Sequence, residues 1–398
     1  MKWALIGPGP EAEGGVAAHQ RRLGQSLVSA GHCVEQFGFV RLYPGWTGAR
    51  PNLGPTGQLD TLHPATWTAV ARQLEASKPD VVIFQYWHPL CVPAYLRLLR
   101  STRSKSGAAR IVLVVHNAVP HEPFPGARAL LAKLVARADH VITHSTAVTQ
   151  RLPACRRVSL LELPALIRLD QSRKPLEATP TQVEFFLAPG PKRAYKGAGL
   201  LGRAWRQARF DRRVELVVAG SQRIGGGRWR WRATSVPDIV FWNRYFDDDE
   251  LVWMLSHCAA LVLPYRWATQ SGWPAAARLL GVPVIATDVG GLAEQLKGAD
   301  ADLVAAGDCV GLAAAMVARA RSRSRSRSRS ASASASLRPD RAIDLAVCER
   351  TATAKWKELG EAIEHLVDQP RPSAHGGTTE RRESVFPGVG RGMLRSFR

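Results

Sequence analysis

The sequence predicts an α/β protein made of two Rossmann-like domains, each built on a parallel sheet. Short apolar runs suited to buried strands recur along the chain, and most are followed by a turn and a segment with helical character. Strand, loop, helix and strand in succession form the right-handed crossover unit of a parallel sheet. With 398 residues, 45% of them hydrophobic, the chain can bury two cores of ordinary size.

The first domain is expected over residues 1–170. Its strands are predicted at 3–6, 34–40, 79–85, 109–116 and 141–144, with a helix at 16–30 and a proline- and glycine-rich loop at 41–60. Histidines stand at or just beyond the ends of three of these strands, at His88, His116 and His144. Ligands of parallel sheets bind at the carboxyl ends of strands, so this edge is the expected site.

The second domain is expected over residues 182–337, after a linker at 171–181. Its strands are predicted at 183–188, 214–220, 260–263 and 283–287, with a helix at 308–320. Asp247 and the two acids after it precede a helix, where they suit capping better than metal binding. Residues 321–336 repeat Arg and Ser without apolar side chains, which predicts disorder. A further helix is expected within 338–368, followed by a disordered basic tail at 369–398.

The net charge and the cysteine pattern indicate which kinds of partner and which cellular compartment suit the chain. The formal charge is +21, from 54 Lys and Arg against 33 Asp and Glu, so the chain should attract nucleotides, anionic lipid headgroups or nucleic acid. Six cysteines are scattered singly, without the spacing of a metal site, which favours buried thiols in a reducing compartment. No signal peptide or spanning segment is recognisable. We expect a cytoplasmic protein whose charge allows peripheral contact with the inner face of an anionic membrane.

The stretch at 259–294 holds the chemically most informative loop. A buried strand ends there in a polar loop with Gln270, Ser271 and Gly272, and an alanine-rich helix follows. Ser271 suits an N-cap and Gly272 lets backbone approach a ligand, so this helix start is a candidate phosphate site. Gly14 and Gly15 offer a similar turn before the first helix. An ordinary capped helix and an ordinary tight turn fit these local patterns about as well.

The sequences of several segments resemble those of one enzyme family. LPYRWATQSG…GVPVIATDVGGLAE resembles the nucleotide-sugar-binding segment of retaining GT-B glycosyltransferases of the bacterial family 4 type, and GGV, QYWHP and VVHNAVPHE resemble other parts of it. The resemblance implies two domains facing across a cleft, with the donor held mainly by the second, and a C-terminal helix that crosses back to the first. The family's Glu-x7-Glu pair is missing: the aligned positions are Ala268 and Ala276, or Trp267 and Ala275.

The resemblance also assigns roles. His116 would lie beside the transferred sugar, and Lys196, in a loop similar to the family's basic G-R-x-x-x-x-K-G loop, would stabilise the departing diphosphate. Pro191 stands where that loop usually has arginine. The donor-binding set is Gly14, Gly15, Arg193, Lys196, Gln270, Ser271, Gly272 and Glu294, and the acceptor-binding set is His19, His88, His121, Glu122 and His144. Neither a metal nor another cofactor is implied, because the nucleotide sugar is the substrate.

We therefore expect a retaining glycosyltransferase of the hexosyltransferase type, which moves a sugar from a nucleotide-diphosphate donor to a glycan or lipid-linked acceptor. Two alternatives stay open. The missing glutamates and Pro191 suit a degenerate GT-B protein that binds nucleotide or glycan without turnover. The charge and the Arg/Ser repeat suit nucleic-acid binding, which is less favoured because a repeat expansion in a surface loop accounts for them.

Overall fold

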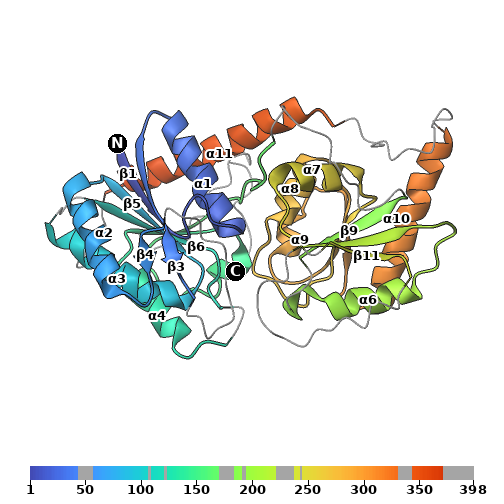
Figure 1. Ribbon diagram of the computed structural model, residues 1–398, viewed down its shortest axis with the longest axis horizontal. Helices are drawn as coiled ribbons and strands as arrows, with labels where there is room; N and C mark the ends of the chain where they lie inside the picture. The colour runs from blue at the N-terminus through green and yellow to red at the C-terminus, as the bar shows by residue number, and fades with distance from the viewer. Residues whose placement is uncertain are drawn as a thin grey trace, which may run out of the picture.

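The computed structural model describes residues 1–43, 57–105, 109–120, 123–169, 183–190, 194–220, 237–242, 244–329 and 343–370. The chain folds into two α/β lobes that lie side by side, and helix α11 (Leu345–Asp368) runs along both of them (Figure 1). Helix α11 packs on α1 in the first lobe and on α8 in the second. Among the described residues, no helix has the length and apolarity needed to cross a membrane.

The first lobe contains a parallel sheet in the order β2-β1-β5-β6-β7-β8. Its strands are β1 (Lys2–Ile6), β2 (Cys33–Phe37), β5 (Val81–Tyr86), β6 (Arg110–Val115), β7 (His140–Thr143) and β8 (Val158–Leu160). Its helices are α1 (Gly15–Ser29), α2 (Pro64–Ser77), the 3₁₀ turn η2 (Pro89–Cys91), α3 (Val92–Lys105), α4 (Ala127–Val135) and α5 (Thr146–Thr149). The central strands are buried on both faces, as their continuous apolar runs predict.

The second lobe contains a parallel sheet in the order β11-β10-β9-β12-β13-β14, in which the strand order reverses between β9 and β12. Its strands are β9 (Phe185–Pro189), β10 (Glu215–Ala219), β11 (Ile239–Trp242), β12 (Leu261–Leu263), β13 (Val284–Thr287) and β14 (Ala301–Val304). Its helical segments are η3 (Ala194–Lys196), α6 (Ala198–Gln207), α7 (Asp248–His257), α8 (Trp273–Leu279), α9 (Leu292–Gln295) and α10 (Cys309–Arg329). The α/β fold with two Rossmann-like domains is confirmed.

Three local expectations need correction. The predicted strand at 34–40 is two strands, β2 and β3 (Phe39–Arg41), because the chain breaks at Gly38, where a Cβ would lie 2.8 Å from Gly9 Cα. The predicted loop at 41–60 ends in a short strand, β4 (Leu59–Asp60), which pairs with β3. Helix α10 continues through Arg329, so the first nine residues of the Arg/Ser repeat are helical rather than disordered; arginine is a good helix former and extends the helix begun by the alanine-rich segment.

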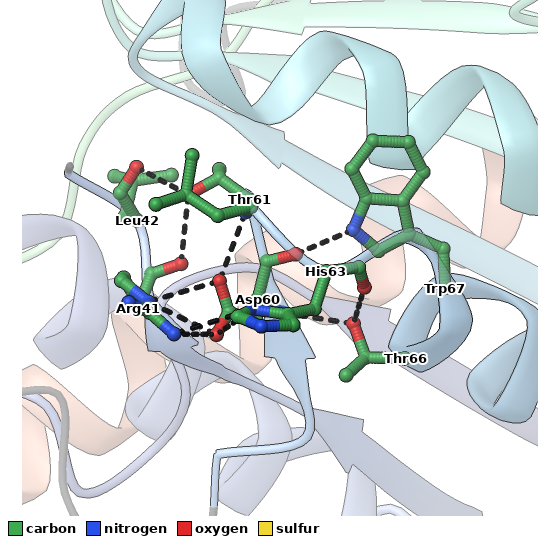
Figure 2. Close-up of polar contacts among 8 residues, drawn as sticks. Arg41, Leu42, Asp60, Thr61, His63, Thr66 and Trp67 are labelled. Carbon is green, nitrogen blue, oxygen red and sulfur yellow. Dashed lines mark hydrogen bonds and ion pairs between the residues drawn. The ribbon is translucent and has the colours of Figure 1, made fainter.

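A buried carboxylate fastens the small β3–β4 ladder to the start of α2 (Figure 2). Arg41 Nε lies 3.0 Å from both carboxylate oxygens of Asp60, and His63 Nδ1 lies 3.0 Å from Oδ2. Trp67 Nε1 donates to the carbonyl oxygen of Asp60 at 2.7 Å. Burial opposes the charged form, but hydrogen bonds and the charge of Arg41 prevail and lower the pKa of Asp60. The cluster therefore holds this edge of the first lobe without contributing to the cavity described below.

Helix α11 is anchored to the first lobe by a buried indole. Trp356 is 2% exposed and packs in the core of the first lobe, while its Nε1 donates to the carbonyl oxygen of Ala165 at 2.9 Å. Glu349, earlier on the same helix, accepts from the amide of Leu169 at 3.1 Å and forms an ion pair with Arg22. The predicted crossing helix is present, although it starts at Leu345, after the N-cap Asp344.

Truncating this indole should destabilise the protein more than any surface change on the same helix. We expect Trp356→Ala to lower the free energy of unfolding by about 3–5 kcal/mol, because it removes a large buried side chain and leaves a cavity. Lys357→Ala is the matched control, since Lys357 is an exposed neighbour and should change stability by less than about 0.5 kcal/mol. Urea denaturation of both variants measures the difference, and equal losses would contradict the assigned anchoring.

Candidate active site between the two domains

A cavity of about 260 Å³ lies between the lobes, where loops from the carboxyl ends of both sheets meet. Its walls are formed by Gly15, Val16, His19, His116, Asn117, Leu163, Leu166, Tyr195, Lys196, Tyr265, Gln270, Ser271, Gly272 and Trp273. Among the described residues, this set contains one lysine, two histidines and no carboxylate. Residues that the sequence assigns to donor binding, catalysis and acceptor binding therefore share one hollow.

The second domain contributes two loops to the cavity wall, one after β9 and one after β12, the two strands between which the strand order reverses. Lys196 ends the turn η3 after β9, and Tyr265 follows β12. Gly197, with φ +74°, allows these loops to meet, because a Cβ there would lie 1.6 Å from the carbonyl oxygen of Pro264. Lys196 Nζ lies 5.7 Å from the centroid of the Tyr265 ring. Burial raises the pKa of Tyr265, so its hydroxyl adds no negative charge beside the lysine.

The start of helix α8 differs from expectation. The N-cap is Gly272 rather than Ser271, and Ser271 Oγ accepts only a long hydrogen bond, 3.4 Å, from Trp273 N. The amide of Ser271 donates to Gln295 Oε1 at 2.9 Å, and Gln295 Nε2 donates back to the carbonyl oxygen of Ser271 at 3.0 Å. That amide is therefore engaged within the protein and does not serve a phosphate. Local sequence does not show this, because Gln295 lies 24 residues further on.

Direct contacts hold the loop before α8 against the first domain. Thr269 Oγ1 donates to Asn117 Oδ1 at 2.8 Å, and Ser145 Oγ donates to the carbonyl oxygen of Thr269 at 2.8 Å. At Gly272 a Cβ would lie 2.7 Å from Leu166 Cδ1, so a side chain there would require the leucine side chain to move. The relative placement of the two cavity walls thus depends on contacts between the domains.

Three buried histidines cluster behind and along the wall from the first domain. His19 lies on α1, His116 follows β6 and His144 follows β7. The centroid of the His19 ring lies 4.9 Å from that of His116 and 5.0 Å from that of His144. His116 Nε2 lies 2.6 Å from Gln85 Oε1, and its Nδ1 lies 3.4 Å from Gln270 Nε2. His19 and His116 line the cavity, whereas His144 lies behind His19 and does not line it.

Burial keeps these imidazoles neutral. It lowers the pKa of His19 and His116 well below the ordinary value, with a further lowering from the neighbouring histidines. It also lowers the pKa of His144 to about 4, against a smaller opposing effect of the hydrogen bond to Leu161. Near neutral pH the cavity therefore carries the positive charge of Lys196 without added charge from these rings.

Several expected site residues lie elsewhere. His88 Nδ1 accepts from the amide of Leu90 at 3.2 Å and caps η2, away from the cavity lining. Glu294 bonds the amide and hydroxyl of Thr146 at 2.9 and 2.8 Å, so it fastens the domains and is no part of the cavity wall. The remaining expected residues, Arg193, His121 and Glu122, lie outside the described residues.

A second cavity of about 240 Å³ adjoins the first and shares Gly15, Leu166, Gly272 and Trp273 with it. Its other wall residues are Gly14, Ala18, Arg21, Ile167, Tyr245, Phe246, Asp248, Leu251 and Ala276. Asp248 is the one acid in this lining; the amide of Arg168 donates to its Oδ2 at 3.0 Å, and burial raises the pKa of its carboxyl. Sequence reasoning treated Asp248 only as a helix-start residue, and nothing local distinguishes it from Asp247, which forms the capping box.

The described part of the chain brings together no set of three His, Cys, Asp or Glu side chains able to hold a metal ion. The cavity can instead bind an anion through Lys196 and offer neutral polar groups to an uncharged, hydroxylated ligand. Tyr195, Tyr265 and Trp273 add aromatic faces that the sequence did not single out. One sequence feature could have identified Tyr265, namely its position directly after a predicted buried strand and Pro264.

The histidine cluster predicts a pH-dependent stability. These rings are neutral in the folded state but take up protons near pH 6.5 in the unfolded chain, so unfolding binds protons as the pH falls from about 6.5 to about 4. The free energy of unfolding should therefore decrease over this range, by up to about 1.4 kcal/mol per pH unit for each such histidine. Comparing urea denaturation of His144→Gln with wild type from pH 7 to pH 4.5 isolates one contribution, and parallel pH profiles would contradict it.

Two family models match the chain, one for each domain. The model described as Glycosyltransferase Family 4 matches residues 13–160, and the model described as Glycosyl transferases group 1 matches residues 185–321. No sequence among the curated proteins compared matches significantly. The two matched ranges include every strand of the two sheets except β1, and every residue of the cavity wall except Leu163 and Leu166.

Solved structures match the fold over nearly the whole chain. Sucrose-phosphate synthase from Thermosynechococcus elongatus is 18% identical, with a TM-score of 0.59 and coverage of 92% of this chain and 96% of that one. The lipopolysaccharide outer core galactosyltransferase WaaB is 17% identical, with a TM-score of 0.58 and coverage of 92% and 99%. Anabaena HepE in complex with UDP and glucose is 14% identical, with a TM-score of 0.58 and coverage of 92% and 99%.

At such low identity these structures establish the fold, while the family models establish the kind of domain in each half. The two-domain arrangement expected from the sequence is that of the GT-B structures. With a glycosyltransferase domain in each half, the chain is a glycosyltransferase of the GT-B type.

Proposed function

We propose that the protein transfers a hexosyl group from a nucleoside-diphosphate donor to a glycan or lipid-linked acceptor with retention of configuration. The observation that carries this proposal is the shared cavity: Lys196 from one domain and His116 from the other line it together. The solved structure of HepE, which has the same fold, holds UDP and glucose. A cavity with one lysine and no carboxylate in its lining suits the diphosphate of such a donor.

Lys196 would act on the leaving group. As the bond between the anomeric carbon and the diphosphate oxygen breaks, negative charge grows on that oxygen, and a lysine fixed beside it stabilises the transition state more than the ground state. The acceptor hydroxyl oxygen forms the new bond to the anomeric carbon, and its proton passes to the departing diphosphate. The burial of the neighbouring Tyr265 strengthens the effect of the charge, because fewer water molecules screen it.

The two adjoining cavities suit the two ends of the donor. With the diphosphate near Gly15 and Lys196, the sugar would lie toward His116 and the nucleoside in the second cavity, where Asp248 offers an acceptor to its hydroxyl or amine groups. Ala276, one of the positions where the family has a glutamate, lines this second cavity. Asp248, which lines the same cavity from α7, would supply a carboxylate from another element.

Retention is supported by what the cavity offers. An inverting transfer needs a general base, usually a carboxylate, on the face of the sugar opposite the leaving group, and no carboxylate is found among the described residues that line the first cavity. Attack from the face of the departing diphosphate, which itself takes up the acceptor proton, needs neither this base nor an enzyme nucleophile. Measurement of the anomeric proton coupling in the product tests this point, and an inverted product would overturn it.

A GT-B protein that binds its nucleotide without turnover is the second candidate. It is favoured by the alanines at Ala268 and Ala276 and by the first of these being buried outside both cavity linings. The two functions separate in one assay. Release of sugar from a donor supports transfer, whereas tight nucleotide binding without release supports the degenerate form.

A screen of nucleotide sugars by thermal shift should identify the donor. A ligand that binds only the native state stabilises it by about 2.7 kcal/mol at a concentration 100 times its Kd, so the true donor should raise Tm by several degrees. Donors that raise Tm are then tested for release of sugar or nucleotide. A panel of UDP-, GDP-, ADP- and dTDP-sugars that leaves Tm unchanged would contradict nucleotide-sugar binding.

Removal of the lysine should impair turnover much more than donor binding. We expect Lys196→Ala to lower kcat by roughly 10²–10³-fold, the range for losing one donor that stabilises a developing negative charge. Lys297→Ala is the matched control: it removes the same charge from the second domain, but Lys297 is exposed and lies outside the first cavity. Equal kcat values for Lys196→Ala and wild type in a donor-consumption assay would contradict the assigned diphosphate position.

A further inference from the structure

The hydrogen bonds of the histidine cluster determine which nitrogen of each ring carries a proton. The chain of bonds starts at the carbonyl oxygen of Leu161, which can only accept and lies 3.0 Å from His144 Nδ1. His144 must therefore be protonated at Nδ1, and as a neutral ring it has a lone pair at Nε2. That lone pair lies 3.1 Å from His19 Nε2. His19 must accordingly donate from Nε2.

The same reasoning leaves one lone pair of His19 without a partner. A neutral ring protonated at Nε2 has its lone pair at Nδ1, and this atom is buried and bonded to none of the described residues. The His19 side chain is 1% exposed and forms part of the cavity wall. An unsatisfied buried polar atom costs free energy, and a ligand in the cavity that donates a hydrogen bond would recover it.

We infer that His144 is a positioning residue that holds His19 in the tautomer whose Nδ1 accepts a hydrogen bond from a sugar hydroxyl in the cavity. The inference rests on the proposed function, because it takes the ligand of this cavity to be a sugar. His144 itself does not touch the ligand; it acts by accepting from His19 Nε2. The role expected for His144 from the sequence, direct acceptor binding, is replaced by this indirect one.

The cavity has a second neutral histidine and a further unpaired acceptor. His116 donates from Nε2 to Gln85 Oε1, so its Nδ1 lone pair accepts from Gln270 Nε2 at 3.4 Å. Gln270 Oε1 is buried without a partner among the described residues. The hydrogen-bond acceptors that these side chains bring to the first cavity are thus neutral.

Neutral acceptors have a physical consequence for the ligand. A carboxylate beside the donor diphosphate would repel it, whereas an imidazole lone pair binds a hydroxyl without adding negative charge. Lone pairs also repel a carboxylate on the ligand. The arrangement therefore suits a neutral hexose and disfavours a uronic acid.

The tautomers can be read directly from the full chain labelled with ¹⁵N-histidine. At pH 7, long-range ¹H–¹⁵N correlation spectra should show His144 protonated at Nδ1 and His19 protonated at Nε2, with assignments from single substitutions. His144→Phe removes the acceptor for His19, so its two tautomers should then mix. His140→Phe is the matched control, since His140 is a buried histidine of the same chain segment that bonds Ser159 instead. A wild-type His19 protonated at Nδ1, or charged, overturns the inference.

Kinetics test whether the lone pair is used. With the nucleotide sugar that wild type consumes fastest in the screen, His144→Phe should lower kcat/KM about tenfold relative to His140→Phe, the effect of one lost hydrogen bond. His19→Asn, which can present an amide oxygen near the position of Nδ1, should retain more activity than His19→Leu. Equal kcat/KM for the two Phe variants, or for the two His19 variants, overturns the inference.

The two proposals fail in different ways. A wild-type protein that consumes no nucleotide sugar contradicts the proposed function, and the spectra still decide the tautomers. A protein that transfers sugar while His19 is protonated at Nδ1 contradicts the positioning role alone. Thermal unfolding of each variant shows whether it is folded, so a loss of activity is not confused with a loss of structure.

Discussion

Close packing at two glycines, against backbone at Gly197 and against a leucine side chain at Gly272, is the constraint on which the cavity depends. Gly197 lets the loop after β9 meet the loop after β12, and Gly272 lets the start of α8 meet Leu166 of the other domain. A methyl group at either position would overlap atoms that belong to the opposite segment. In each case the two segments in contact are far apart in the sequence, and both contacts shape the cavity walls.

Fixed placement of the domains then turns scattered polar residues into one site. The contacts of Thr269 with Asn117 and Ser145, and of Glu294 with Thr146, join the domains on one side. Helix α11 also joins them, because Trp356 anchors it to the first domain and Cys348 Sγ donates to the carbonyl oxygen of Leu279 on α8 in the second. A cavity with walls from two domains requires such fastening, because a shift of about 1 Å is enough to misplace catalytic groups.

The cavity has fewer negatively charged groups than the family pattern implies. The acids expected at Ala268 and Ala276 are absent, the histidines are neutral through burial, and Lys196 provides the charge. Among the described residues that line the two cavities, Asp248 is the one acid, and it lies in the adjoining cavity. The described wall of the first cavity thus places no negative charge where a diphosphate would leave, and its hydroxyl acceptors are uncharged atoms.

The sequence by itself determined the α/β class, the two sheets and the segments from which the site is built, because buried parallel strands and their loops have strong local patterns. It placed His116 at the end of a strand, and Lys196 and Gly272 in loops that join a strand to a helix; all three line the cavity. The break at Gly38, the helical start of the Arg/Ser repeat and the capping of η2 by His88 were missed, since neighbouring backbone and helix continuation decide them.

Only the tertiary structure decided what each site residue bonds. Gln295 engages the amide of Ser271 from 24 residues away, Leu161 sets the tautomer of His144, and Glu294 bonds Thr146 rather than a ligand. Such partners lie far apart in the chain and meet only when the domains pack. Hydrogen bonding and burial depend on those meetings, so protonation and availability for a ligand are properties of the fold and not of the local sequence.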